Sequence, residues 1–199
     1  MKDQFIKKIK DKDAKIAVFG LGYVGVPTAT ILAEAGFKVV GVDKNPTAVD
    51  AISKGLCNTV EPSLVELVKT TIKEGLLTVT IDGLFAVKES DIVLICVPTP
   101  VTRKKEPDLS SLEEACETIA KGLSKGKLII LESTVPPNVT NGFVLPLLEA
   151  GGLKAGIDFW VAYCPERITP GETLQDFIEN PRLIGGYTAE SAELAAELY

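Results

Sequence analysis

Short apolar stretches recur along the chain and alternate with longer segments whose apolar residues repeat at helical spacing. The short stretches predict strands at Ile16–Phe19, Lys38–Val42, Leu77–Ile81, Ile92–Val97, Leu128–Leu131, Phe159–Tyr163 and Leu183–Ile184. The longer segments predict helices at Val24–Ala35, Pro46–Lys54, Ser63–Glu74, Leu109–Leu123, Val139–Glu149 and Ala189–Tyr199. Because strands that alternate with helices pair in parallel, the pattern predicts an α/β fold with a doubly wound, mainly parallel sheet and helices on both faces.

The two ends of the chain stand apart from this alternation. Residues 1–13 are highly charged, and we expect a frayed or short amphipathic lead-in helix before a single α/β domain over residues 14–188. Residues 189–199 have good helix composition but no stop signal, and a helix of about 11 residues is marginal alone. We therefore expect the start of a truncated helix that leads toward further domains and needs further chain to pack on.

The first predicted strand runs directly into Gly20-x-Gly22-x-x-Gly25. In dinucleotide-binding turns the first glycine permits a tight turn, the second lets the backbone approach a pyrophosphate, and the third lets the following helix pack closely. The N-terminus of that helix offers free N–H groups and the positive end of its dipole to phosphates. The segment therefore predicts a Rossmann-like nucleotide site, and a purely structural glycine-rich turn is the alternative.

The second predicted strand closes on Asp43, which lies 23 residues after Gly20. At this distance a carboxylate can accept hydrogen bonds from an adenosine ribose. It would also repel a 2′-phosphate, and the only adjacent cation is Lys44. The expected cofactor is therefore NAD rather than NADP.

Polar residues and prolines follow three further predicted strands. Thr99 and Pro100 follow the fourth, Thr134 follows the fifth, and Glu166-Arg167 follows the sixth. Carboxyl ends of parallel strands share one edge of a sheet, so these residues are expected to form one composite site with the glycine turn. Taken singly, each also fits an ordinary loop or a surface ion pair.

The composition of the chain argues against several kinds of site and partner. The chain has no histidine, which removes the commonest general base and metal ligand, and we expect no metal site. Its four cysteines are scattered, outside any CxxC or zinc spacing. A net charge of −6 without a long basic run argues against nucleic acid or a membrane surface as partner. No apolar run spans a bilayer and no secretory signal opens the chain, so we expect a cytoplasmic protein.

Several motifs, in order, resemble the UDP-glucose/GDP-mannose dehydrogenase family. They are GLGYVGVPTA at 20–29, VEPSL at 60–64, CVPTP at 96–100, EPDLSSLEEA at 106–115, LESTVPP at 131–137 and YCPERITPGETLQDFIENPRLIGG at 163–186. The CPER-x-x-PG form is most similar to the branch that acts on UDP-N-acetyl-D-mannosamine. Where the UDP-glucose branch places a second glutamate this chain has Pro170, so no role of that glutamate is carried over.

The resemblance implies the NAD-binding domain of a UDP-sugar 6-dehydrogenase, which oxidises a sugar alcohol to a uronate with two NAD⁺. The family's cysteine nucleophile lies beyond this domain, and Cys164 does not match it, so the chain alone is expected to be inactive. The resemblance further implies a UDP-N-acetylhexosamine substrate, and we expect the full-length protein to be a homodimer or higher homo-oligomer. A two-electron dehydrogenase of the hydroxyacid type and a stand-alone NAD-binding module are the alternatives.

The resemblance also assigns individual residues. It places Gly20, Gly22, Tyr23, Val24 and Gly25 on the pyrophosphate, Asp43 on the adenosine ribose, and Thr99, Pro100 and Thr134 toward the nicotinamide. Thr134 matches a threonine that orients a water molecule, and it is a catalytic candidate together with Glu166. Glu166, Arg167 and Ile168 match a segment that meets the UDP-sugar.

Overall fold

A computed structural model describes residues 2–57, 59, 61–169 and 171–199. It contains a seven-stranded sheet in the order β3-β2-β1-β4-β5-β6-β7, in which every pair is parallel except β6 with β7. The strands are β1 (Lys15–Phe19), β2 (Lys38–Val42), β3 (Leu77–Thr80), β4 (Ile92–Ile95), β5 (Leu128–Leu131), β6 (Trp160–Tyr163) and β7 (Gly185–Gly186). The predicted doubly wound α/β fold is confirmed, with its switch point between β1 and β4.

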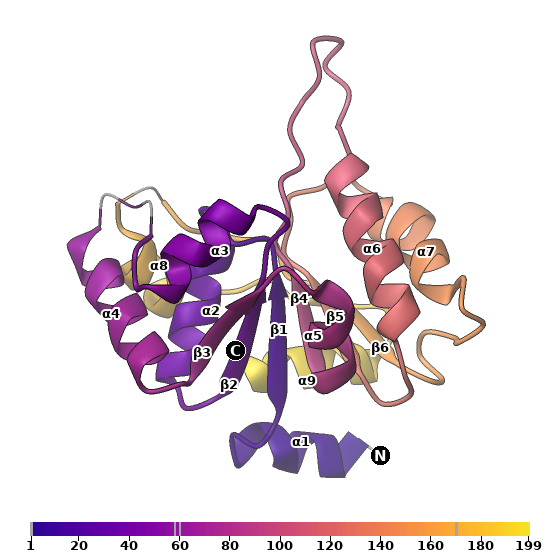
Figure 1. Ribbon diagram of the computed structural model, residues 1–199. Coiled ribbons are helices and arrows are strands. Elements are labelled where there is room, and N and C mark those ends of the chain that lie inside the picture. Colours follow the sequence, from indigo (N-terminus) through magenta and orange to yellow (C-terminus); the bar gives the residue numbers. More distant parts are fainter. Residues whose placement is uncertain (1, 58, 60, 170) are drawn as a thin grey trace.

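Helices cover both faces of the sheet (Figure 1). The described helices are α1 (Lys2–Lys10), α2 (Gly25–Glu34), α3 (Pro46–Ser53), α4 (Pro62–Lys73), α5 (Gly83–Glu89), α6 (Ser110–Gly122), α7 (Leu145–Glu149), α8 (Thr173–Glu179) and α9 (Ala189–Leu198). A π-helical turn, η1 (Thr140–Val144), precedes α7, so the helix predicted over Val139–Glu149 is interrupted. None of these helices is long and apolar enough to cross a lipid bilayer.

Alternate residues of the central strands enter two separate cores. Val18, Leu94 and Ile130 point toward α1, α2 and α9, whereas Phe19 and Ile95 point toward α5, α6 and α7. These strands are buried on both faces, which explains why their sequences are apolar throughout rather than alternating.

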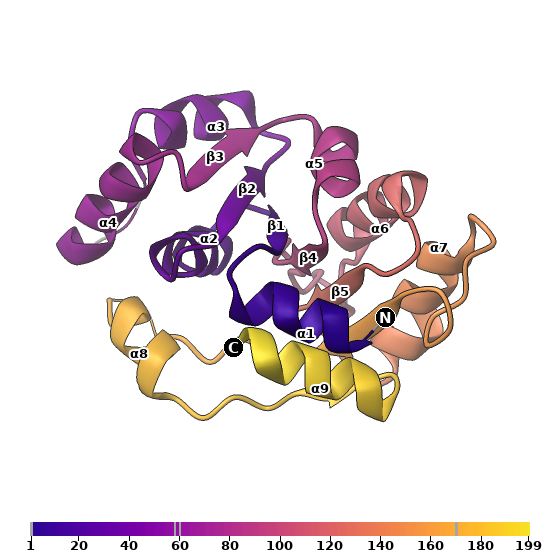
Figure 2. The ribbon, with the colours of Figure 1, turned by 90° about the horizontal axis from the view of Figure 1, so that it is seen from below.

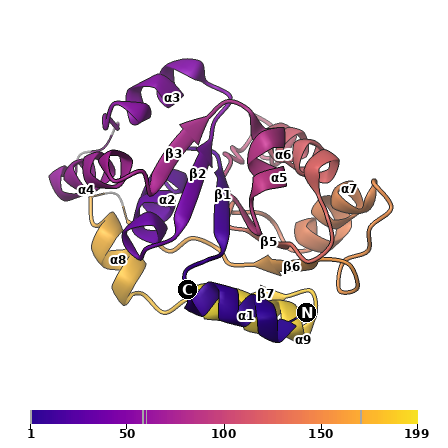
Figure 3. The same ribbon diagram turned by 60° about the horizontal axis from the view of Figure 1, so that its bottom comes forward.

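The two ends of the chain pack together below the sheet (Figures 2 and 3). On α1, Phe5 and Ile9 are buried, and the centroid of the Phe5 ring lies 5.1 Å from that of the Trp160 ring in β6. On α9, Leu194 and Leu198 enter the same core. Within the described residues α9 therefore packs against α1 and the sheet, and the expectation that it leads toward further domains stays a prediction. Of the two alternatives for residues 1–13, the structure contains the short amphipathic helix, α1, with Phe5 and Ile9 on its buried face.

Two helices and one strand differ from the sequence prediction. The helices α5 and α8 are absent from it, and β7 forms at Gly185–Gly186 rather than at Leu183–Ile184. Between β4 and α6 a long excursion, closed by a bridge between Val101 and Pro107, projects beyond the carboxyl edge of the sheet (Figure 1).

Candidate functional site

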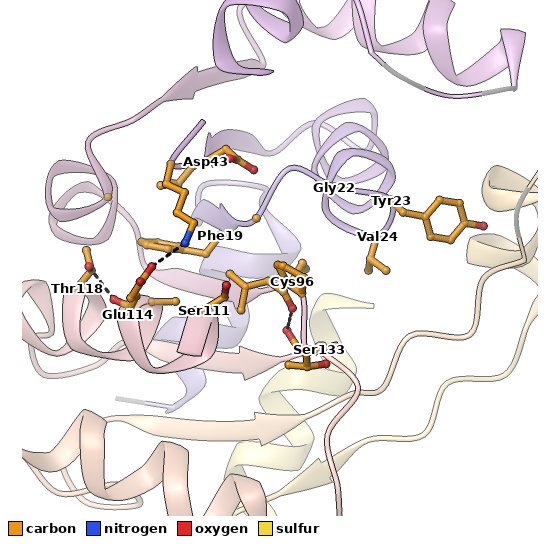
Figure 4. A pocket seen from close by; sticks show the side chains of 18 of the residues that line it. Phe19, Gly22, Tyr23, Val24, Asp43, Cys96, Ser111, Glu114, Thr118 and Ser133 are labelled. Atoms are coloured by element: carbon orange, nitrogen blue, oxygen red, sulfur yellow. Dashed lines mark hydrogen bonds and ion pairs between the residues drawn. The ribbon is translucent and has the colours of Figure 1, made fainter. Parts of the chain in front are cut away.

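A cleft of about 550 Å³ opens at the carboxyl ends of the central strands, at the switch point of the sheet. Phe19 ends β1 and Gly20 follows it, Asp43 follows β2, Cys96 follows β4, and Ser133 follows β5 (Figure 4). Ligands of doubly wound sheets bind where the strand order reverses, so both position and volume suit a nucleotide.

The three glycines of the turn after β1 meet different constraints. Gly20 has a φ of +89°, and a Cβ there would lie 2.7 Å from the carbonyl oxygen of Cys96. A Cβ on Gly25 would lie 1.7 Å from the carbonyl oxygen of Gly20. Gly22 lines the cleft, yet a Cβ there would meet nothing within 4 Å and its φ is not positive. Gly20 and Gly25 are therefore required by the fold, whereas the space beside Gly22 is left open for a ligand.

The N-terminus of α2 fits an anionic group. No side chain caps this helix end, and its first turn carries no acidic residue. The first N–H groups of a helix lack intrahelical partners and bear partial positive charge, so they can bind a phosphate. Tyr23 and Val24, which precede the helix, also line the cleft. This donor set and the open space at Gly22 fit a pyrophosphate.

The Asp43 carboxylate borders the same turn. One oxygen accepts the Leu21 N–H at 2.8 Å, and the other accepts the Asn45 N–H at 2.9 Å. A carboxylate has about four lone-pair positions, so Asp43 retains capacity to accept ribose hydroxyls. The neighbouring Lys44 pairs with Glu114 of α6 at 2.9 Å (Figure 4). The cation next to Asp43 is thus held by a carboxylate on the opposite wall.

Hydrogen bonds join the loops after β4 and β5. The Thr99 hydroxyl donates to the Thr134 carbonyl at 2.6 Å, and the Ser133 hydroxyl donates to the Val97 carbonyl at 2.7 Å. Thr134 itself is exposed in the cleft. The structure therefore brings Thr99 and Thr134 together on one wall, as the composite-site hypothesis requires.

The segment after β6 brings Glu166 to the cleft but not its neighbours. Arg167 is exposed and its guanidinium donates to the Pro181 carbonyl, while Ile168 is half-buried. Neither residue lines the cleft, and nor do Gly25 and Pro100. Pro170 lies outside the described residues.

Beneath the cleft, Glu132 accepts hydrogen bonds from three side chains. Thr28 lies at 3.1 Å, Cys96 at 3.2 Å, and the Tyr199 hydroxyl also donates to this carboxylate. Burial, reinforced by Glu132, raises the pKa of the Cys96 thiol well above its ordinary value. Sequence reasoning missed this network because its members come from four distant elements.

Cys164 lies beside the same network and is fully buried. The Arg182 guanidinium comes within 3.9 Å of its sulfur. Burial and the Glu132 carboxylate nevertheless raise the pKa of Cys164. A thiol with a raised pKa is a poor nucleophile, so Cys164 is not activated.

The wall formed by α6 was also missed. Its contributors to the cleft are Ser111, Glu114, Ala115 and Thr118. The polar Asp108-Leu-Ser-Ser run after the fourth strand marks the start of this helix, and it is the signal that could have placed them. Among the described residues, no group of three or more histidine, cysteine, aspartate or glutamate side chains is placed to hold a metal ion.

The residues that form this cleft fall within a known domain. Residues 14–199 match the NAD binding domain of the UDP-glucose/GDP-mannose dehydrogenase family. The chain belongs to this family. NAD is therefore the cofactor of the domain, in agreement with the carboxylate of Asp43 and the open space beside Gly22.

Dehydrogenases from distant organisms are similar to this chain over most of its length. The chain is 40% identical to UDP-N-acetyl-D-mannosamine dehydrogenase of Pyrococcus horikoshii over 93% of its own length and 44% of that protein. It is 41% identical to the enzyme of that name in Escherichia coli, over 94% of this chain and 45% of that protein. The chain thus spans less than half the length of these dehydrogenases.

Solved structures share the fold. The P. horikoshii UDP-N-acetyl-D-mannosamine dehydrogenase has a TM-score of 0.88 at 41% identity, over 93% of this chain and 44% of that one. A ternary complex of GDP-mannose dehydrogenase from Pseudomonas aeruginosa has a TM-score of 0.89 at 35% identity, over 92% of this chain and 43% of that one. A 3-hydroxyisobutyrate dehydrogenase from Mycobacterium tuberculosis has a TM-score of only 0.60 at 20% identity, and this similarity shows a common fold alone.

Proposed function

We propose that this chain is the cofactor-binding part of a dehydrogenase that oxidises UDP-N-acetyl-D-mannosamine at C6 to the uronate with two NAD⁺. The observation that carries the proposal is the cleft at the switch point, where Gly22 leaves room for a pyrophosphate beside Asp43. The relatives with this substrate in their names support the choice of sugar.

In this proposal the two halves of the cleft hold the two halves of the cofactor. The backbone of Gly20, Gly22, Tyr23 and Val24 and the start of α2 at Gly25 face the pyrophosphate. Asp43 accepts hydrogen bonds from the adenosine ribose. Thr99 and Thr134, with Pro100 as a stiffening residue behind them, line the nicotinamide side.

Residues after β5 and β6 are proposed to meet the substrate. Thr134 is exposed in the cleft, where its hydroxyl can orient a water molecule. Glu166, which also lines the cleft, is the second catalytic candidate. Arg167 and Ile168 are proposed substrate contacts that lie outside the cleft lining and can bind only at its margin.

The electron balance fixes the cofactor stoichiometry. Conversion of a primary alcohol to a carboxylate removes four electrons as two hydrides and takes one oxygen atom from water. Each bound NAD⁺ accepts one hydride, so two NAD⁺ are consumed for each sugar that is oxidised. The chain has no activated thiol among its described cysteines, and we propose that it binds NAD yet turns over nothing alone.

The test measures NADH per sugar with the full-length protein. We expect two NADH for each UDP-N-acetyl-D-mannosamine consumed, and a lower kcat/KM for UDP-glucose. One NADH per sugar would instead support a two-electron dehydrogenase. The 199-residue chain, incubated with the same substrates, should produce no NADH, and steady production would reveal a catalytic group within it.

A further inference from the structure

Glu61 is a buried carboxylate that lies at the start of α4 and is only 8% exposed. It accepts the backbone N–H of Thr173 at 3.0 Å through one oxygen and that of Leu174 at 3.2 Å through the other. These partners lie 112 and 113 residues away in sequence. Both oxygens are therefore used to hold the first turn of α8.

The two hydrogen bonds from the start of α8 to Glu61 are expected to stabilise the position of this helix. The α8 helix has no side-chain cap of its own, so its first N–H groups would otherwise lack partners within the protein. Hydrogen bonds to a buried charged acceptor are stronger than those between neutral groups, and a carboxylate also complements the positive end of a helix. Glu61 thus attaches the start of α8 to the start of α4, and α8 lies beside α2 (Figure 2).

The segment Tyr163–Gly186, which contains α8, is tied together internally. The Thr169 N–H donates to Asp176 at 2.6 Å, and the Asn180 amide donates to the Arg167 carbonyl at 2.8 Å. The Ile168 N–H donates to Glu166 at 3.1 Å. Because these bonds span from Glu166 to Asn180, a displacement of α8 displaces Glu166 as well.

Tyr23 of the glycine turn borders the same cleft as this segment. It lines the cleft together with Glu166, and its side chain extends away from α2 (Figure 4). Partial burial, with smaller contributions from the Glu166 and Glu61 carboxylates, raises the pKa of the Tyr23 hydroxyl. The glycine turn and the segment that carries Glu166 therefore form parts of one cleft.

We propose that Glu61 is a positioning residue: by holding the start of α8 it fixes the segment Tyr163–Gly186 beside α2 and so places Glu166 at the cleft. Glu61 thereby acts on the sugar side of the site, through Glu166. The sugar side of this statement rests on the function proposed above, whereas the anchoring of α8 does not.

Hydrogen exchange on the 199-residue chain tests the anchoring. In Glu61→Gln, whose amide group presents an N–H to one of the two donors, the Thr173, Leu174 and Ile168 amides should exchange about tenfold faster or more. Glu66→Gln makes the same charge change at an exposed position of α4 and should match the wild type. Glu61→Asp, which keeps the charge but shortens the reach, should be intermediate. Unchanged exchange in Glu61→Gln would overturn the proposal.

Steady-state kinetics on the full-length protein separate positioning from general stability. Glu61→Gln should raise KM for the UDP-sugar about tenfold while KM for NAD changes less than threefold. Equal losses for both substrates would mean that Glu61 only stabilises the fold. If the wild-type protein fails to oxidise the UDP-sugar, the proposed function falls, and the exchange experiment still decides whether Glu61 anchors α8.

Discussion

The Asp43 carboxylate lies 2.8 Å from the backbone nitrogen of Leu21 and accepts its N–H. This bond ties the acid at the end of β2 to the turn that follows β1. The residue proposed to recognise the ribose therefore also shapes the turn proposed to hold the pyrophosphate, and the two functions cannot be lost independently.

Replacement of Asp43 by alanine should weaken NAD binding about 10- to 150-fold, because charge-assisted hydrogen bonds worth roughly 1.5–3 kcal/mol are removed. Calorimetry on the 199-residue chain measures this loss. Asp50→Ala, which removes an exposed carboxylate paired with Lys54 on α3, is the control and should bind normally. The wild type should prefer NAD, and equal affinity for NADP would contradict the role of Asp43.

Two glycines should respond in opposite ways. Gly22→Val should keep the free energy of unfolding within about 0.5 kcal/mol of wild type and abolish NAD binding, because the side chain enters open space that the ligand needs. Gly25→Ala should destabilise the fold by about 1–3 kcal/mol or more, because its Cβ would collide with the Gly20 carbonyl. Urea unfolding and calorimetry separate these effects. Unaltered NAD affinity in Gly22→Val would make the turn purely structural.

Burial should keep three of the thiols unreactive. It raises the pKa of Cys116 to about 12, and it also raises the pKa values of Cys96 and Cys164. At pH 8 only about one Cys116 in ten thousand is then a thiolate. Cys57 is half-buried, so iodoacetamide should label it first, as peptide mass spectrometry can report.

The matched control for this labelling is Cys57→Ser, which should lose the fast phase. Labelling of all four positions after unfolding in urea verifies that each thiol is competent. Fast reaction of Cys164 in the folded protein would mean that Arg182 outweighs burial and that a nucleophile lies within this chain.

High pH should reduce the stability that the buried Tyr199 hydroxyl and its contact with Glu132 contribute to the fold. Burial, and then the Glu132 charge, raises the pKa of the Tyr199 hydroxyl well above its usual value near 10. From about pH 10 the unfolded chain releases this proton while the folded protein keeps it, so the stability that Tyr199 supplies at neutral pH declines as pH rises. Tyr199→Phe should cost about 1–3 kcal/mol at pH 7 and less at pH 10.5.

Urea unfolding at the two pH values measures this difference. Tyr187→Phe, at an exposed tyrosine, should show neither the loss nor its pH dependence. A cost for Tyr199→Phe that is independent of pH would show that the phenol is not protonated preferentially in the folded state.

The parts of the fold that depend on local pattern were predictable. The strands β1, β4, β5 and β6 are short apolar runs between polar turns, and their burial on both faces makes the signal strong. The missed α5 is a short helix that begins at a glycine, and its clearest signal is Asp82, whose side chain accepts the Phe85 N–H. Glycines carry little strand propensity, so β7 at Gly185–Gly186 left no trace in the sequence.

The remaining features of the fold and of the site depend on contacts between residues far apart in sequence, and these could not be predicted from local patterns. The α8 helix starts where Glu61, from another part of the chain, accepts its first N–H groups, and no local rule links residues so far apart. The same holds for Glu132, whose motif was noticed but whose burial beneath Thr28 and Tyr199 was not. The cleft residues that follow strands were found because strand ends share one edge, whereas those on α6 required the tertiary structure.

The segment Tyr163–Gly186 leaves the sheet at Tyr163 and returns beside it, since Tyr163 is paired with Gly185. The two ends of the segment are therefore adjacent, so its length and sequence can change without changing the order of the other strands. On the function proposed above, changes confined to this one insert would alter the contacts with the sugar while the sheet and the glycine turn stay the same.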